Sequence, residues 1–360
     1  MNPMIRNKRN STLEMLRIVS MIFIVANHYS GETPWKINDL TSPIRILGYY
    51  FYKPLGQVGV DIFVLITGYF MITREDVVSK NIKRVGKIWL EVLFYSIICF
   101  LIVTSFSREL SIKRLIVALF PFSLSEYWFV TAYIMLIILM PLINLGIKLI
   151  TKYTYIYILV SIILFSQVFP IINNNIFSLS KGFGDVLAVY LLGGFLKKYP
   201  VKLNRLILIM GISISYLLML CSILVLSILT KNSGNLFRFC YGILPFVTAV
   251  NIFILFINLP STSNEIINKI ARSVFSTYII TENPNINEIL WHHIFNMSSI
   301  NNIILVVFLG VIISLVLLVL TVILDKLRIW LFTVLKINII IFNIIDRTTN
   351  KFKLLKTTKN

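Results

Sequence analysis

Long apolar stretches alternate with short polar segments along almost the whole chain. A run of about 20 apolar residues is the length that an α-helix needs to cross a bilayer. The pattern therefore predicts an all-α integral membrane protein with about ten transmembrane helices. We place these helices at residues 13–30, 56–73, 88–106, 127–147, 155–172, 183–196, 206–229, 239–258, 273–291 and 302–324.

The composition supports this class and adds an orientation. The chain has 360 residues, of which 57% are hydrophobic and 14% charged, which excludes an ordinary soluble protein. Most of the 34 lysines and arginines lie in alternate connecting segments and in both terminal tails. Because basic loops stay on the cytoplasmic side, we predict cytoplasmic N- and C-termini. The net charge of +19 then reflects topology, and we expect no nucleic-acid partner.

The same pattern divides the chain into three parts. A short basic tail at residues 1–12 precedes the ten-helix membrane domain at residues 13–324, and a second basic tail covers residues 325–360. Within this last tail, Ile329–Ile345 is apolar but is interrupted by Lys336. We therefore expect it to form a helix that lies at the membrane surface in contact with lipid, and not an eleventh span.

The first predicted helix combines membrane-spanning length with ionisable side chains. Arg17 and His28 are eleven residues apart, about 20° beyond three full turns, so they share one helix face with roughly 16 Å between them along the axis. Glu14 is three residues before Arg17 and within reach of it. Such groups are costly inside a membrane and usually face a wet cavity or the protein interior. This helix therefore offers a cation near one end and a possible base near the other, although a purely structural histidine remains an alternative.

Other polar residues point to a hydrated interior. Arg84 and Lys87, near the start of the third span, are suited to contact phosphate. The ninth span is interrupted by Pro284, as in helices that line cavities. Acids recur in or near the spans, at Asp61, Glu91, Glu126, Asp185, Glu282 and Glu288. The three cysteines lack ligand spacing, and we expect no metal site.

Several of these features occur together in one known family. They are the pair Arg17 and His28, the segment GVDIFVLITGYFM and the basic stretch after it, EYWFVTAY in the fourth span, and TYIITENPNINEILW in the ninth. From Leu13 to about Leu324, and in the same order, the chain resembles the membrane acyltransferases called acyltransferase family 3. The resemblance implies ten spans in a bacterial cell membrane and O-acylation, expected to be acetylation, of surface-polysaccharide sugars.

The resemblance also implies a donor, an acceptor and a site. The donor is a cytoplasmic acyl-CoA, expected to be acetyl-CoA, with no permanently bound cofactor, and the acceptor is a polysaccharide or lipid-linked glycan. His28 is the expected catalytic residue. The expected substrate-binding residues are Arg17, Glu14, Arg84, Lys87, Asp61, Glu126, Trp128, Tyr278 and Glu282. Two positions depart from the family pattern, because Lys87 replaces an arginine and Thr281 stands where many relatives have a histidine.

Other functions also fit the pattern of spans and charges. A transporter or flippase for an anionic lipid-linked sugar would need the same intramembrane charges, but not the pair Arg17 and His28. A glycan polymerase or ligase would have a larger outer loop than any found here. Direct transfer and a covalent acyl intermediate are both compatible with the sequence, which does not fix an oligomeric state.

Overall fold

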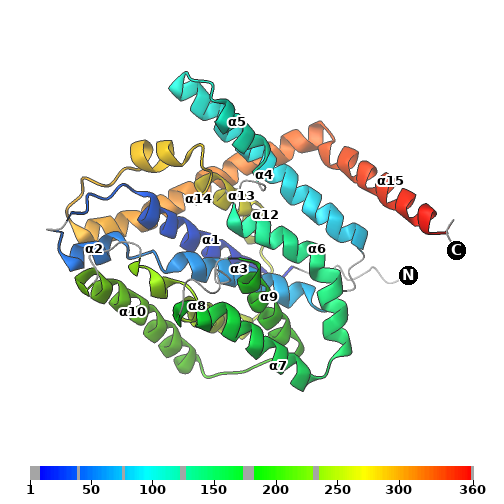
Figure 1. Cartoon of the computed structure of the whole chain (residues 1–360), viewed down its shortest axis with the longest axis horizontal. Coiled ribbons are helices and arrows are strands. Elements are labelled where there is room, and N and C mark those ends of the chain that lie inside the picture. Colours follow the sequence, from blue (N-terminus) through cyan, green and yellow to red (C-terminus); the bar gives the residue numbers. More distant parts are fainter. Residues whose placement is uncertain are drawn as a thin grey trace.

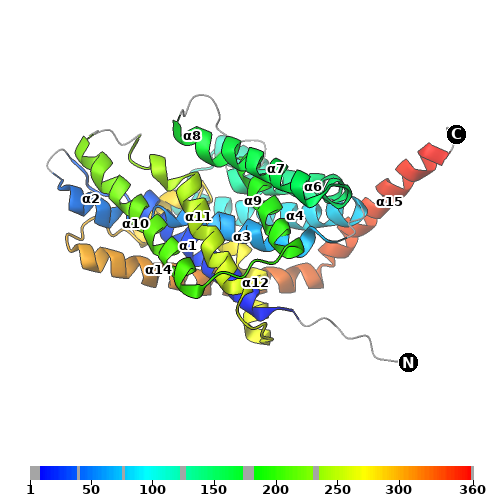
Figure 2. The same cartoon turned by 90° about the horizontal axis from the view of Figure 1, so that it is seen from below.

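The computed structural model describes residues 9–38, 41–74, 78–121, 127–172, 182–229 and 235–357. Throughout these residues the chain is helical or irregular, with no strand. The helices form one bundle whose long members run roughly along its longest axis, while the last helix extends away from it (Figures 1 and 2). The expected all-α class is therefore confirmed.

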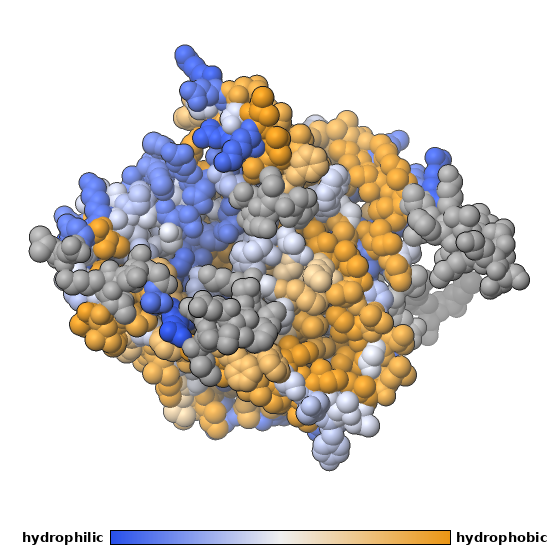
Figure 3. Space-filling view, in the orientation of Figure 1, coloured by the Kyte–Doolittle hydropathy of each residue, from blue (hydrophilic) through white to orange (hydrophobic). Residues whose placement is uncertain are grey.

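Six helical stretches in the described residues are long and apolar enough to cross a membrane. They are α4 (Val78–Ser107), α6 (Trp128–Leu149), the stretch Lys152–Ile171 that contains α7 (Lys152–Ile163) and a π-helical turn (Leu164–Val168), α10 (Arg205–Leu229), the stretch Arg238–Ile257 that contains α11 (Ile243–Ile257), and α14 (Ile303–Val334). Many of their leucines and isoleucines are exposed, such as Leu206 on α10 and Ile304 on α14, and hydrophobic residues cover a large part of the face in Figure 3. Apolar surface on this scale is suited to lipid, so the chain is a multi-span membrane protein.

Three further helices lie inside this apolar layer. They are α1 (Ser11–Glu32), α3 (Leu55–Met71) and α9 (Phe183–Lys198). α3 is buried on all sides from Gly56 to Gly68 and packs extensively against both α1 and α9. With 17 residues, α3 is only about 25 Å long. Its residues are apolar on nearly every face because protein surrounds the helix on all sides.

Glycines allow α3 to approach its neighbours at backbone distance. A Cβ atom on Gly68 would overlap the carbonyl oxygen of Tyr190 on α9, and one on Gly193 of α9 would overlap the carbonyl oxygen of Leu65 on α3. On the other side, a Cβ on Gly59 would collide with the carbonyl oxygen of Ser20 on α1. Small residues are how membrane helices pack closely without a hydrophobic driving force between them.

The predicted ninth span is broken, as its sequence suggests. It consists of α13 (Phe275–Thr281) and, after a loop, a π-helical turn (Ile289–Ile294). A further helix, α12 (Glu265–Ser273), precedes this span where the sequence suggested a connecting segment. Pro284 has no N–H and disfavours helical geometry in the residue before it. The side chain of that residue, Asn283, instead accepts hydrogen bonds from the backbone N–H groups of Asn285 (2.9 Å) and Ile286 (3.4 Å). This turn ends α13 at the centre of the bundle.

Three boundaries differ from those expected. α4 begins at Val78 and not at residue 88, so Arg84 and Lys87 lie on the helix itself. α14 extends past residue 324 to Val334. Arg328 forms ion pairs with Asp325 (2.7 Å) on the same helix and with Glu91 (3.3 Å) on α4. These pairs neutralise the charged residues and allow the helix to continue. The segment expected as one surface helix, Ile329–Ile345, is split at Lys336, whose φ of 53° lies in the left-handed region.

The rest of the described chain consists of connecting helices. α15 (Ile337–Thr357) follows that break and packs against α4, where Lys83 Nζ pairs with Asp346 Oδ2 at 2.7 Å. The short helices are α2 (Pro43–Tyr49), α5 (Ile112–Leu119) and α8 (Phe169–Ile172). α2 packs against α10 and α14, so it helps to close the end of the bundle opposite to α15.

The crossing of α3 and α9 yields a stability prediction. We expect Gly68→Val to lower the thermal unfolding temperature of the detergent-solubilised protein strongly, because overpacking of a close contact costs typically 1–3 kcal/mol and here the obstacle is backbone. Gly146→Val on α6 is the matched control, since nothing lies within 4 Å of its Cβ position. Equal unfolding temperatures for the two variants would contradict this packing.

Candidate functional site

His28, near the end of α1, is held between two consecutive residues at the end of α13. Its Nδ1 lies 2.9 Å from Thr281 Oγ1, and its Nε2 lies 2.6 Å from Glu282 Oε2. The His28 side chain is 6% exposed, whereas the Glu282 side chain is 25% exposed. The early end of α13 at the Pro284 turn is what places both partners beside one ring.

Hydrogen-bond accounting assigns the protons in this contact. Thr281 has one hydroxyl hydrogen, which it donates to the carbonyl oxygen of Thr277 at 2.8 Å, so it accepts a hydrogen bond from Nδ1–H of His28. Nε2 of His28 therefore faces the Glu282 carboxyl group, and a bond of 2.6 Å requires a proton between them. One of these two atoms carries the proton and the other accepts the hydrogen bond.

A cavity of about 260 Å³ opens beside this pair, and we call it the histidine cavity. It has one cationic and two acidic side chains, Lys53, Glu32 and Glu282, together with amides and aromatic rings. Its other lining residues are Ile24, Asn27, His28, Gly56, Gln57, Val60, Trp128, Tyr241 and Tyr278. The mixture of convergent polar groups and aromatic surface is typical of a small-molecule site.

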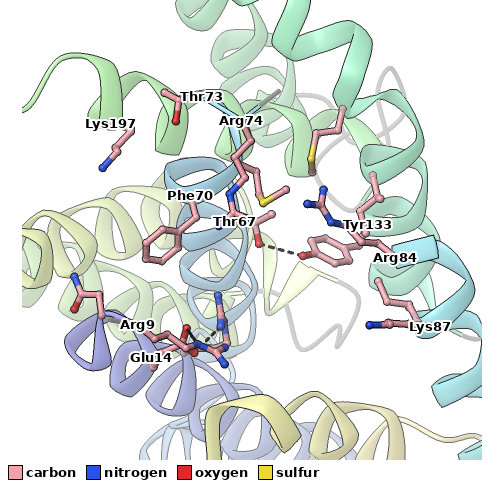
Figure 4. Close-up of a pocket in the computed structure, with 16 residues that line it drawn as sticks. Arg9, Glu14, Thr67, Phe70, Thr73, Arg74, Arg84, Lys87, Tyr133 and Lys197 are labelled. Carbon is pink, nitrogen blue, oxygen red and sulfur yellow. Dashed lines mark hydrogen bonds and ion pairs between the residues drawn. The ribbon is translucent and has the colours of Figure 1, made fainter. Parts of the chain in front are cut away.

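A larger cavity of about 910 Å³ lies at the other end of α1, and we call it the basic cavity (Figure 4). Its ionisable lining residues in the described chain are Arg9, Glu14, Arg17, Arg74, Arg84, Lys87 and Lys197. Tyr133 and Thr67, whose hydroxyl oxygens are 3.1 Å apart, form part of its wall. Six cations against one acid give this cavity an excess of positive charge, which favours anions.

The acid in this cavity orients two of its arginines. Glu14 accepts hydrogen bonds from Arg9 Nε and Arg17 Nη1, each at 2.6 Å. Arg17 keeps a buried Nε that has no hydrogen-bond partner. Across the cavity Arg84 Nη1 donates to Asn81 Oδ1 at 2.5 Å. Because Glu14 and Asn81 fix their guanidinium groups, Arg17 and Arg84 are preorganised at the wall of this cavity.

The structure thus groups most of the expected site residues into two places. Glu14, Arg17, Arg84 and Lys87 line the basic cavity, and His28, Trp128, Tyr278 and Glu282 line the histidine cavity. Glu126 lies outside the described residues. Asp61 lines neither cavity, because it is fully buried on α3 and bonds Gln57 Nε2 (2.9 Å), which also donates to Asp185 (2.7 Å).

Sequence reasoning missed several lining residues. In the basic cavity they include Arg9, Arg74 and Lys197, each of which looked like an ordinary positive loop residue. In the histidine cavity, Lys53 follows an aromatic segment and Tyr241 precedes α11, so neither lies in a motif. Thr281, which contacts His28, could be found from the sequence, because it occupies the position at which the family resemblance leads one to expect a histidine.

Comparison with known proteins identifies one family. The sequence model described as "acyltransferase domain" matches residues 10–323. This range contains the His28 contact, the histidine cavity and every lining residue of the basic cavity except Arg9. No curated protein and no solved structure matches the chain.

Proposed function

The chain belongs to the acyltransferase 3 family, and from this premise we propose that it O-acetylates a cell-surface glycan at the expense of cytoplasmic acetyl-CoA. Membership of this family makes the protein a transferase and confirms the resemblance of its motifs, which disfavours the transporter alternative. The observation that carries the proposal is the His28 ring, fixed between Thr281 and Glu282 at the wall of a cavity.

The basic cavity supports an acyl-CoA as the donor. CoA carries three phosphate groups, and Arg17, Arg84 and Lys87 are among six cations that line this volume of about 910 Å³. Arginine pairs with phosphate in a bidentate manner, and the lysine adds a point charge. In the orientation expected from the loop charges, with ten spans and a cytoplasmic N-terminus, this cavity faces the compartment that supplies acyl-CoA.

The histidine cavity supports a sugar as the acceptor. Trp128 offers an aromatic surface on which a sugar ring can stack, and Asn27, Gln57 and Glu32 offer hydrogen-bond partners for hydroxyl groups. Its volume of about 260 Å³ suits one sugar unit of a longer glycan and not a whole oligosaccharide. In the expected orientation the cavity opens toward the outer side, where surface glycans are modified.

The mechanism follows from the shared proton of the His28–Glu282 pair. When the Glu282 carboxyl group keeps that proton and turns from Nε2 toward the cavity that it lines, the lone pair of Nε2 can accept the proton of an acceptor hydroxyl group. The hydroxyl oxygen then bonds to the thioester carbonyl carbon, the carbon–sulfur bond breaks, and the CoA thiolate leaves and takes up the proton. The hydrogen bond to Thr281 fixes the ring so that Nε2, and not Nδ1, faces the cavity.

The catalytic pair yields a prediction about rate. We expect His28→Ala to reduce CoA release from acetyl-CoA by about 10² to 10⁴, the usual range for loss of a general base. Glu282→Gln should cause a smaller loss, because the amide can still contact His28 but cannot hold the shared proton as a carboxyl group does. Glu288→Gln is the control, since this exposed acid lies on the same segment but lines neither cavity.

The basic cavity yields a prediction about donor affinity. Arg84→Gln and Lys87→Gln should each weaken binding of CoA to the purified protein roughly tenfold, as expected for one lost charge-assisted bond. The difference should shrink as salt is raised, because screening weakens the same interactions. Lys202→Gln, at an exposed lysine that lines neither cavity, should bind like the wild type in calorimetric titrations. Wild-type affinity in both cavity variants would place the CoA phosphates elsewhere.

A further inference from the structure

The two cavities are separate in the structure. No residue that lines the basic cavity also lines the histidine cavity. Arg17 and His28, one in each, are eleven residues apart on one helix, which is roughly 16 Å of axis. A donor whose phosphates bind at Arg17 must therefore extend its acyl arm through the protein to bring the thioester to His28.

A stack of three aromatic rings lies along this route. Phe63 of α3 and Phe275 of α13 stack with centroids 6.2 Å apart and an interplanar angle of 24°. Phe275 and Tyr278, one turn apart on α13, stack at 6.1 Å and 21°. Phe129 of α6 borders the stack, with its ring edge-on to Phe63 (5.9 Å) and to Tyr278 (5.6 Å). Phe63, Phe129 and Tyr278 are all buried.

Each end of the stack meets one of the two cavities. The guanidinium carbon of Arg17 lies 5.7 Å from the Phe63 centroid, and the His28 ring lies 6.2 Å from that of Tyr278. Phe63 and Phe275 line a hollow of about 350 Å³ that shares Arg9, Arg17, Ile88 and Tyr133 with the basic cavity. Tyr278 lines the histidine cavity. An unbroken series of contacts between aromatic rings therefore connects Arg17, the proposed phosphate-binding cation, with His28, the proposed base.

The stack combines a fixed part with a part that can be displaced. Phe63 belongs to the fully buried α3, whereas Phe275 is the half-buried first residue of α13, a helix of seven residues between two breaks. Thr277 on α13 is held by the Thr321 hydroxyl group of α14 at 2.7 Å. No hydrogen bond joins Phe63 to Phe275, and an aromatic pair contributes only about 0.5–1.5 kcal/mol beyond its buried area.

We infer that Phe63, Phe275 and Tyr278 form an aromatic gate through which the acyl arm of the donor reaches His28, and that the gate selects short acyl chains. The inference rests on the proposed function. The arm separates Phe275 from Phe63, and the space that this opens determines how large an acyl group can pass. When no donor is bound, the closed stack keeps the basic cavity apart from the histidine cavity, so that water and ions do not cross.

The gate can be tested by removing its displaceable ring. In Phe275→Ala we expect the rate of hexanoyl transfer relative to acetyl transfer to rise at least tenfold over the wild type, with CoA affinity unchanged because the cations remain. Phe195→Ala is the matched control, since Phe195 is also half-buried and its ring contacts those of Tyr155 and Tyr199, none of which lines either cavity. A wild-type chain-length ratio in Phe275→Ala would overturn the selectivity.

A second measurement does not depend on activity. In a variant that lacks Cys99, Cys221 and Cys240, Asn27→Cys places a thiol in the histidine cavity. A small charged thiol reagent applied from the cytoplasmic face of vesicles should label this thiol at least tenfold faster when Phe275→Ala is added. Equal labelling rates would overturn the gate as a barrier. Absence of CoA release from every donor in the wild type would instead overturn the proposed function, and the labelling result would still decide whether the rings form a barrier.

Discussion

The bundle depends on the need to keep ionisable side chains of α1 away from lipid. Glu14, Arg17 and His28 lie on a helix of membrane-spanning length, where exposure to hydrocarbon would cost several kcal/mol for each charged group. The fold meets this need by placing α1 inside, against α3, α13 and α14. The lipid-facing positions are left to helices with exposed leucine and isoleucine, such as α10 and α14. Burial of α1 in turn requires α3 to lie very close, and Gly59 allows this.

Helix ends inside the bundle supply the polar groups that α1 needs. A continuous ninth span would present only side chains at helical spacing to His28, and adjacent residues of a helix point in different directions. Because α13 ends at Thr281, Thr281 and Glu282 contact the two nitrogens of the same ring. The break also leaves backbone groups to be satisfied. The side chain of Asn283 accepts a hydrogen bond from the backbone N–H of Asn285. The same side chain donates to the Tyr127 hydroxyl oxygen at 2.6 Å, which fixes it in place.

The sequence predicts the local part of this arrangement and not the part that depends on contacts between helices. Apolar runs identify the long helices because bilayer thickness fixes their length, and helical periodicity places Arg17 and His28 on one face. Pro284 predicts the break in the ninth span. The ion pair of Arg328 with Glu91 on α4 helps α14 to continue beyond its apolar run, and neither segment alone reveals it. For the same reason Asp61 could be expected at a site, although Gln57 links it to Asp185 in a buried cluster.

The proposed roles of Arg17 as a phosphate-binding cation and of His28 as the base have a consequence for the substrate, because one rigid helix carries both residues. The separation of Arg17 and His28 cannot change without breaking α1, so a reaction that uses both must have a donor long enough to bridge them. Acyl-CoA meets this condition because its phosphates and thioester lie at opposite ends of an extended arm. The protein must then provide a passage for the arm that is closed at other times, since an open one would let ions leak across the membrane. Aromatic rings suit this task, because they fill space completely, carry no hydrogen bonds that must be broken, and re-form the same contacts once the arm withdraws.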